Sequence, residues 1–303
     1  MNAAGGNSFD VASFVPTLLL GEGVWGRVYD LGDGTVLKIA REQCAGIGSG
    51  RAKIENECEG LTLLAAAGVL AGLVPVVRGR GDIPSSSPLA REGFAVWLRM
   101  TKVSGRTISA DDIDELSRHE QSRIGGDLGV VLARVHAGLR HALAVARRSL
   151  PAVGAVETYA DVANAAARLG DPFYMDAVAQ LTRARCRIPS EVLGHPIHGD
   201  FNSSNILVAE DGRICGILDF AEWRADFPES DFAHMLQELP ALSHDVVASY
   251  ERESGFAADP LRLTLASAEN ALFGAVIAER QRDMHSAQSC RQALTAELEK
   301  LPG

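Results

Sequence analysis

The segment that most constrains this chain is His198-Gly199-Asp200-x4-Asn205, which is followed fourteen residues later by Asp219. Asp200 and Asn205 share one polar loop, and Asp219 follows an apolar run that a β-hairpin folds back beside them. An Asx-rich turn explains each residue alone, but not all three at this spacing. An amide oxygen next to a carboxylate suits Mg²⁺, which also takes phosphate oxygens. The second carboxylate, Asp200, is then free to orient or deprotonate a hydroxyl group.

A glycine-rich motif near the N-terminus, G-x-G-x-x-G-x-V, points to the same chemistry. Its positions are Gly21, Gly23, Gly26 and Val28. Alone this pattern is weak, because a hairpin turn or a dinucleotide-binding fold also produces it. The dinucleotide-binding fold needs a helix at the third glycine, whereas here two β-prone runs follow and the second contains Lys38. A lysine within an apolar strand is costly unless it is paired or bound to a ligand. We therefore expect Lys38 to bind the α- and β-phosphates of a nucleotide, the alternative being an edge-strand lysine that faces solvent.

A phosphate-binding lysine of this kind needs a carboxylate partner on the following helix. The apolar spacing predicts a helix over residues 51–67. Within it, Glu57 precedes Leu61 by four positions and Leu64 by seven, which places it beside the buried stripe. We expect Glu57 to pair with Lys38, and the neighbouring glutamates to face solvent.

The motif around Asp200, Asn205 and Asp219 resembles the catalytic segment of the aminoglycoside phosphotransferase family, which comprises small-molecule kinases with a protein-kinase-like fold. The resemblance runs from about Gly21 to the C-terminal helices. It implies that Mg²⁺-ATP binds between two lobes, that Asp200 is the catalytic base, and that Asn205 and Asp219 hold the metal.

Residues 96–105 resemble the hinge of the same family. The resemblance places Met100 behind the adenine and lets the backbone from Thr101 to Val103 contact the adenine edge. Ordinary core filling is the alternative for Met100.

The fold class expected is α+β with two lobes. Residues 1–103 are predicted to form a β-rich nucleotide-binding lobe, and residues 104–303 a helical lobe with the catalytic loop and the acceptor site. Strands are predicted at residues 15–20, 24–31, 35–40, 74–77, 94–100, 206–208 and 214–220. Further helices are predicted at residues 124–150, at 161–187 with a break near 170–172, and across 231–301.

The net charge of −10 is unevenly distributed, with 18 acidic and 8 basic residues from 193 to 303 and 21 of each before that. This balance argues against nucleic acid or an anionic membrane as the main partner. Residues 219–259 contain ten acidic residues and only two arginines. We expect some to line an acceptor site for a cationic small molecule, and the alternative is that they are solvated helix faces. The candidates are Glu222, Asp226, Glu229 and Glu238.

The acceptor class implied by the resemblance is an antibiotic hydroxyl, on an aminoglycoside or a macrolide, although other antibiotics and metabolites also fit the family. The five cysteines are unpaired in spacing and the N-terminus lacks a signal-peptide pattern, so a reducing cytoplasm is expected. We expect a monomer or a weak dimer.

Two other functions remain open at this level. A protein serine/threonine kinase is suggested by the complete glycine-rich motif, but alanine follows Asp219-Phe220 and only eleven positions separate Asp219 from Ser230. That leaves little room for a peptide-binding activation segment. A non-catalytic nucleotide-binding module would have lost the base, a metal ligand or the lysine, and all of them are present.

Overall fold

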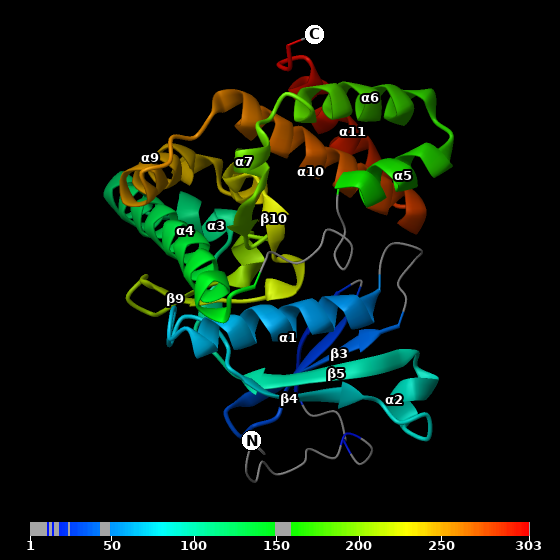
Figure 1. Ribbon diagram of the computed structural model, residues 1–303, viewed down its shortest axis with the longest axis vertical. Helices are drawn as coiled ribbons and strands as arrows, with labels where there is room; N and C mark the ends of the chain where they lie inside the picture. The colour runs from blue at the N-terminus through cyan, green and yellow to red at the C-terminus, as the bar shows by residue number, and fades with distance from the viewer. Residues whose placement is uncertain are drawn as a thin grey trace.

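The N-terminal part of the chain is a five-stranded antiparallel sheet with one long helix against it (Figure 1). The computed structural model describes residues 11, 14, 18–23, 25–42, 49–148 and 159–302. The sheet has the order β1-β2-β3-β5-β4. Its elements and the helices between them are β1 (Leu18–Glu22), β2 (Gly26–Asp30), β3 (Thr35–Arg41), α1 (Gly50–Ala66), β4 (Val77–Asp82), α2 (Pro88–Arg91) and β5 (Phe94–Thr101).

Alternation along β3 separates the two faces of this sheet. Leu37 and Ile39 are buried in a small core on the outer face, together with Trp97 from β5. Val36 and Ala40 belong to the main core, to which α1 also contributes. Because successive side chains of a strand point to opposite faces, Lys38 lies on the inner face.

Strand β4 is the one strand of this sheet that the sequence pattern misplaces. The pattern predicts a strand at residues 74–77, whereas β4 begins at Val77 and continues through the polar sequence RGRGD. Two glycines within it lie under the ring of Trp97, where a Cβ would be 3.4 Å from the ring at Gly79 and 3.1 Å from it at Gly81. These glycines let the β4 backbone approach the Trp97 ring closely. Strand propensities disfavour glycine, so they do not predict a strand here.

The rest of the chain forms a mainly helical lobe. Its helices are α3 (Ala110–Asp114), α4 (Arg118–Ala146), α5 (Tyr159–Leu169), α6 (Pro172–Arg185), α7 (Ser190–Leu193), α8 (Phe232–Glu238), α9 (Ser243–Ser254), α10 (Pro260–Gln281) and α11 (Met284–Leu298). Its strands are β6 (Arg106–Thr107), β7 (His195–Ile197), β8 (Ile206–Val208), β9 (Ile214–Ile217) and β10 (Arg224–Asp226). Short 3₁₀ turns are η2 (Ser203–Asn205), η3 (Phe220–Glu222), η4 (Pro228–Asp231) and η5 (Pro240–Leu242).

Helix α4 is the central support of this lobe. The apolar repeat predicted for residues 124–150 is buried, although the helix begins six residues earlier, behind a capping box formed by Ser117 and Glu120. Helix α9 packs closely on it, because a Cβ on Gly129 would lie 2.2 Å from the carbonyl oxygen of Val246. The end of the predicted helix, at residues 149–150, lies outside the described residues.

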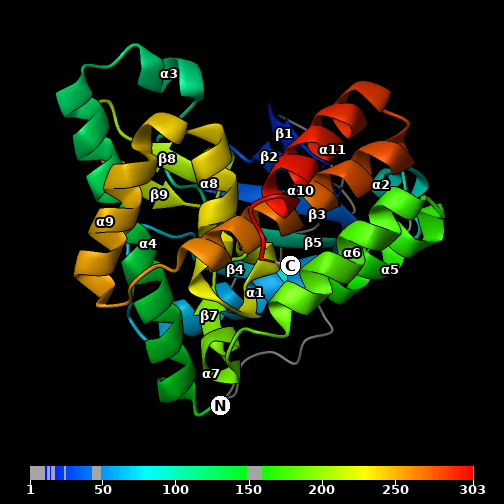
Figure 2. The same cartoon turned by 90° about the horizontal axis from the view of Figure 1, so that it is seen from above.

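A second helical group, formed by α5, α6, α10 and α11, has its own core and stands apart from α4 and α9 (Figure 2). The break predicted near residues 170–172 is confirmed, since α5 ends at Leu169 and α6 starts at Pro172 behind an Asp171 cap. The polar loop after β7 carries Asp200, and the segment after β9 carries Asp219.

Two helices, α4 and α10, are long and apolar enough to cross a membrane by length and composition alone. Their most apolar windows are 61% and 44% buried within the fold. Core helices pass the same test, so this is weak evidence for a membrane span.

Candidate active site

The glycine-rich motif forms the turn between β1 and β2. The Gly23 N–H donates to the Gly26 carbonyl at 2.9 Å, which closes the turn. Gly26 is required by packing, because a Cβ there would lie 1.8 Å from the carbonyl oxygen of Ile39 on β3. Open space surrounds Gly21 and Gly23, so a ligand can approach their backbone closely. Val24 lies outside the described residues.

Lys38 is held by two carboxylates that come from different parts of the chain. Its Nζ lies 2.8 Å from Glu57 Oε2 on α1 and 2.7 Å from Asp219 Oδ1, after β9. Glu57 is 1% exposed, whereas Asp219 is 36% exposed and faces the space between the lobes. The expected pairing of Lys38 with Glu57 is therefore present. Val28 is half-buried directly across from Lys38 on β2.

The pKa values in this group follow from burial and charge. Burial alone would lower the pKa of Lys38, but Asp219 and Glu57 outweigh it and raise that pKa. Burial raises the pKa of Glu57 to about 7 against the opposing effect of Lys38. Burial would also raise the pKa of Asp219, but the Lys38 ammonium holds it below its usual value. Lys38 therefore stays protonated near neutral pH and presents a fixed positive charge.

The loop from His198 to Asn205, which the sequence predicts as the catalytic loop, fixes the carboxylate of Asp200 from two sides. The Asn202 amide donates to its Oδ1 at 2.8 Å, and the Asn205 amide donates to its Oδ2 at 3.0 Å and to its carbonyl at 2.9 Å. His234 Nε2 lies 3.9 Å from Oδ1. Asp200 is thus oriented while its carboxylate remains part of a cavity wall.

The buried carboxylate of Asp231 holds the loop from below. It accepts the backbone N–H of His198 and that of Gly199, each at 2.7 Å, and His136 Nε2 donates to it at 2.8 Å. Asp231 stands at the N-cap position of α8, but its side chain makes no cap hydrogen bond to that helix. Its oxygens are instead used by the loop and by α4.

The residues predicted to hold a metal are chemically suited to Mg²⁺. Both amide hydrogen bonds of Asn205 use its nitrogen, so its Oδ1 is left as a neutral oxygen ligand. Asp219 contributes a carboxylate in an unusual left-handed backbone conformation, with φ of 60°. Within the described ranges no group of three or more His, Cys, Asp or Glu side chains could hold an ion unaided. A Mg²⁺ ion here would depend on phosphate and water oxygens to complete its shell.

In the predicted hinge, two of the three backbone N–H groups are already hydrogen-bonded within the fold. The N–H of Thr101 donates to the Val76 carbonyl at 2.9 Å and that of Lys102 to the Gly34 carbonyl at 2.9 Å, so both are committed to the lobe. The Val103 N–H makes no hydrogen bond within the described residues, which leaves it available to a ligand. Met100 is buried in the main core.

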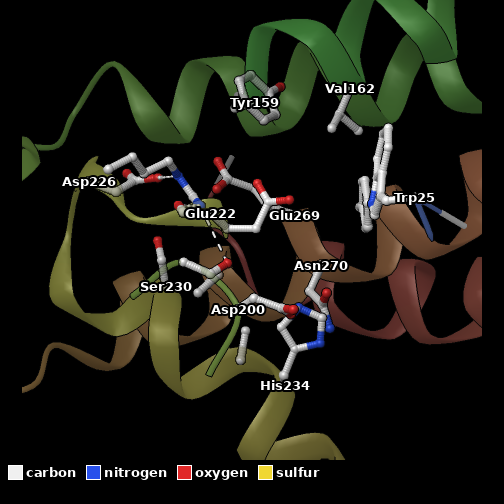
Figure 3. A pocket seen from close by; sticks show the side chains of 15 residues that line it. Trp25, Tyr159, Val162, Asp200, Glu222, Asp226, Ser230, His234, Glu269 and Asn270 are labelled. Carbon is white, nitrogen blue, oxygen red and sulfur yellow. Dashed lines mark hydrogen bonds and ion pairs between the residues drawn. The ribbon is translucent and has the colours of Figure 1, made fainter. Parts of the chain in front are cut away.

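A cavity of about 180 Å³ lies beside Asp200 (Figure 3). It is bounded by the glycine-rich turn, the catalytic loop, the segment after Asp219, and helices α5, α8 and α10. Its lining side chains include Trp25, Tyr159, Val162, Asp200, Glu222, Arg224, Asp226, Ser230, His234, Glu269, Asn270 and Phe273.

Of the four acidic residues expected to line an acceptor site, the structure brings two to this cavity. Glu222 and Asp226 line it. Glu229 is fully buried and pairs with Arg262 at 2.8 Å, away from the cavity. Glu238 is exposed and accepts the Ser203 N–H at 2.9 Å. The expectation that Glu229 and Glu238 line the acceptor site is therefore wrong. Glu229 instead joins η4 to α10 through Arg262, and Glu238 joins α8 to the loop that contains Ser203.

The sequence reasoning missed Trp25, Tyr159, His234, Glu269 and Asn270 as cavity residues. Glu269 lies on α10 and pairs with Arg185 from α6 at 2.8 Å. Burial raises the pKa of Glu269 to about 7, against the effect of Arg185. No local pattern marks these residues, because α5, α8 and α10 meet only in the folded chain. Trp25 could have been found from its place at the tip of the glycine-rich turn.

A β-rich lobe carrying a paired lysine, next to a helical lobe with a braced Asp200 loop, defines a kinase-like class of protein. Residues 18–264 match the model of the phosphotransferase enzyme family. The chain belongs to this phosphotransferase family, as the resemblance implied.

Solved structures agree on the fold. The GDP and kanamycin complex of APH(2")-IIia has a TM-score of 0.65 at 16% identity, covering 95% of each chain. The gentamicin-APH(2")-IIa complex gives 0.63 at 14%, covering 93% of this chain and 92% of that one. A ternary complex of the aminoglycoside phosphotransferase APH(4)-Ia with ADP and hygromycin B gives 0.60 at 18%, covering 94% of each. A search of curated proteins found no match.

Proposed function

We propose that this protein transfers the γ-phosphate of ATP to a hydroxyl group of a small molecule, with antibiotics such as aminoglycosides and macrolides as the candidate acceptors. The observation that carries this is the position of Asp200. Its carboxylate is oriented by two amide donors and opens into a cavity that the glycine-rich turn also bounds. A hydroxyl in that cavity is therefore placed between a base and the nucleotide site.

In this proposal the chain binds ATP under the β1–β2 turn. The backbone around Gly21, Gly23 and Gly26 approaches the phosphates, Lys38 contacts the α- and β-phosphates, and the Val103 N–H reads the adenine edge. Val28 and Met100 lie on the sheet face that the adenine would pack against.

Asp200 accepts a hydrogen bond from the acceptor hydroxyl, aligns its oxygen with the γ-phosphate and takes its proton. Asn205 and Asp219 would hold Mg²⁺, which when bound neutralises charge that develops on the phosphates. Glu57 keeps Lys38 in place. Asp231 maintains the loop geometry.

The protein kinase alternative is weakened by the segment after Asp219. Residues 220–231 are folded as η3, β10 and η4, and β10 pairs with β7. A peptide-binding activation segment needs a longer stretch there. The non-catalytic alternative has no lost residue to support it.

We also propose a soluble cytoplasmic protein, a monomer or weak dimer, without nucleic-acid or membrane partners. The net charge of −10 supports this, since nucleic acid and anionic lipid repel such a chain. The division into lobes at residues 103 and 104 is kept as part of the proposal.

The experiment is an ATP-consumption screen with aminoglycosides, macrolides and a generic protein substrate, with products identified by mass spectrometry. Asp200→Asn should lower kcat by about 10²- to 10⁴-fold, since it removes a general base, while the nucleotide dissociation constant changes little. Asp211→Asn, on an exposed turn with the same chemical change, is the matched control. Full activity in Asp200→Asn would rule out the assigned role.

A further inference from the structure

The carboxylates of the acceptor cavity already have cationic partners within the chain. Glu222 is paired with Lys53, whose ammonium also lies 4.4 Å from the centre of the Trp25 ring. Asp226 is 2.5 Å from Arg185 and 3.4 Å from Arg224.

The same Arg185 guanidinium lies 2.8 Å from Glu269, so one arginine joins two of the cavity carboxylates. Arg224 is fixed by the carbonyl oxygens of Gly199 and Glu222 at 3.3 and 3.2 Å. These cations are part of the cavity wall and its backing, not mobile surface groups.

Counted over the described residues, the cavity therefore presents almost no net charge. Four carboxylates (Asp200, Glu222, Asp226 and Glu269) stand against three cations (Lys53, Arg185 and Arg224). Asp200 is the one carboxylate of the four that is without a Lys or Arg contact. Asp226 is 6% exposed and Glu269 14% exposed, so an incoming ammonium would have to displace the half-buried Arg185 to reach them. Breaking a buried ion pair is strongly unfavourable.

The remaining wall is mostly apolar and aromatic, and its polar side chains are Ser230, His234 and Asn270. Trp25, Tyr159, Val162 and Phe273 contribute ring and aliphatic surface, and Trp25 and Val162 lie at one end of the cavity (Figure 3). Neutral polar contacts are available in this space from Asn270 and Ser230.

We propose that the acceptor presents to Asp200 a hydroxyl-bearing ring that is neutral or carries a single positive charge, and that polycationic acceptors are disfavoured by the built-in cations. This inference rests on the proposed function and narrows it. It limits to one the positive charges on the cationic acceptor that the acidic count of residues 219–259 suggests. Among the described cavity carboxylates Asp200 provides the one negative charge without a Lys or Arg partner, and Trp25 provides the stacking face.

The test measures binding, so that it does not depend on turnover. The full chain is saturated with Mg²⁺ and a non-hydrolysable ATP analogue and titrated calorimetrically with kanamycin, which carries several ammonium groups, and with glucosamine, which carries one. In the wild type, kanamycin should bind no more than about tenfold more tightly than glucosamine at a physiological ionic strength of about 0.15 M. Kanamycin affinity in the low micromolar range that collapses on adding salt would overturn the proposal.

A pair of variants tests the electrostatic reason directly. Lys53→Met exposes the charge of Glu222 and should strengthen kanamycin binding at least tenfold at low salt, with little change for glucosamine. Lys53→Met/Glu222→Gln loses the same contact without adding charge and should return kanamycin to the wild-type affinity. If Lys53→Met leaves kanamycin binding unchanged, or if both variants strengthen it equally, charge compensation is not what excludes polycations.

Because Lys53 is buried, a second pair guards against loss of folding. Arg185→Gln exposes Asp226 and Glu269, and Arg185→Gln/Glu269→Gln is its charge-matched control. If Arg185→Gln binds kanamycin more tightly than both the wild type and the double variant, the proposal is supported. If all three proteins bind kanamycin with the same affinity, the proposal is overturned. A screen that finds no phosphorylated acceptor would contradict the proposed function while leaving these binding comparisons intact.

Discussion

The hydrogen bonds around Asp231 allow a quantitative prediction for Asp231→Asn. The buried carboxylate accepts three donors, the N–H groups of His198 and Gly199 and the His136 ring. An asparagine keeps the shape but turns one acceptor into a donor, which faces a backbone N–H. A hydrogen bond to a charged group contributes about 2 kcal/mol, and neutralising the acceptor weakens each of the other two by about 1 kcal/mol. Asp231→Asn should therefore lower the free energy of unfolding by about 4 kcal/mol.

The assay is urea unfolding at pH 7 followed by tryptophan fluorescence, since Trp223 is fully buried in the main core. Asp283→Asn is the matched control, because Asp283 caps α11 at an exposed position and asparagine caps equally well. It should change stability by less than about 0.5 kcal/mol.

The stability contributed by Asp231 depends on pH. Burial would raise the pKa of Asp231, but the His136 ring and the backbone N–H groups hold it below its ordinary value. The contribution to stability is thus full above the unfolded carboxyl pKa of about 3.9, and is lost as the pH falls through the lower folded value. The difference in the free energy of unfolding between the wild type and Asp231→Asn should become smaller below about pH 4. If Asp231→Asn lowers the free energy of unfolding by less than about 1 kcal/mol at pH 7, the reasoning is refuted.

Three other predictions follow from separate contacts. Lys38→Met should raise the KM for ATP more than tenfold and that for the acceptor by less than twofold; steady-state kinetics with each substrate varied would decide this, and equal effects would contradict a phosphate-binding role. Glu269 has a raised folded pKa of about 7, so it should make the protein lose stability as the pH rises from about 4.3 to that value. Glu269→Gln should flatten that part of the stability–pH profile, and an unchanged slope would be evidence against it. Gly26→Ala should lower the melting temperature by several degrees, because its Cβ would lie 1.8 Å from a β3 carbonyl oxygen. Gly21→Ala, in open space, should leave the melting temperature nearly unchanged. Similar melting temperatures for the two variants would disprove the packing argument.

Local patterns were sufficient where one element sets its own environment. The apolar repeat of α4 and the helix phase that brings Glu57 toward Lys38 are both present in the structure. Both depend on the period of a single helix, which the sequence records directly. The roles of Asp200, Asn205 and Asp219 stay predictions, although the loop geometry around Asp200 is consistent with them.

Contacts between distant elements were beyond such patterns. Strand β4 was misplaced because its glycines are explained by packing against Trp97, which lies on another strand. Thr101 was assigned to the nucleotide, but its N–H is used by Val76. The cavity residues on α5 and α10 meet Asp200 only through the packing of helices that are far apart in sequence.

The acidic excess of residues 219–259 shows why a charge count along the chain does not predict the field of a site. Within that window only two arginines are present, so the segment looks unneutralised. In the fold, Asp219, Glu222, Asp226 and Glu229 are contacted by Lys38, Lys53, Arg185 and Arg262, all from outside the window. A carboxylate paired in this way fixes one element to another and attracts a cationic ligand weakly, because its charge is already compensated at contact distance. The attraction available to an acceptor is set by the carboxylates that the fold leaves unpaired, and at this cavity that is Asp200.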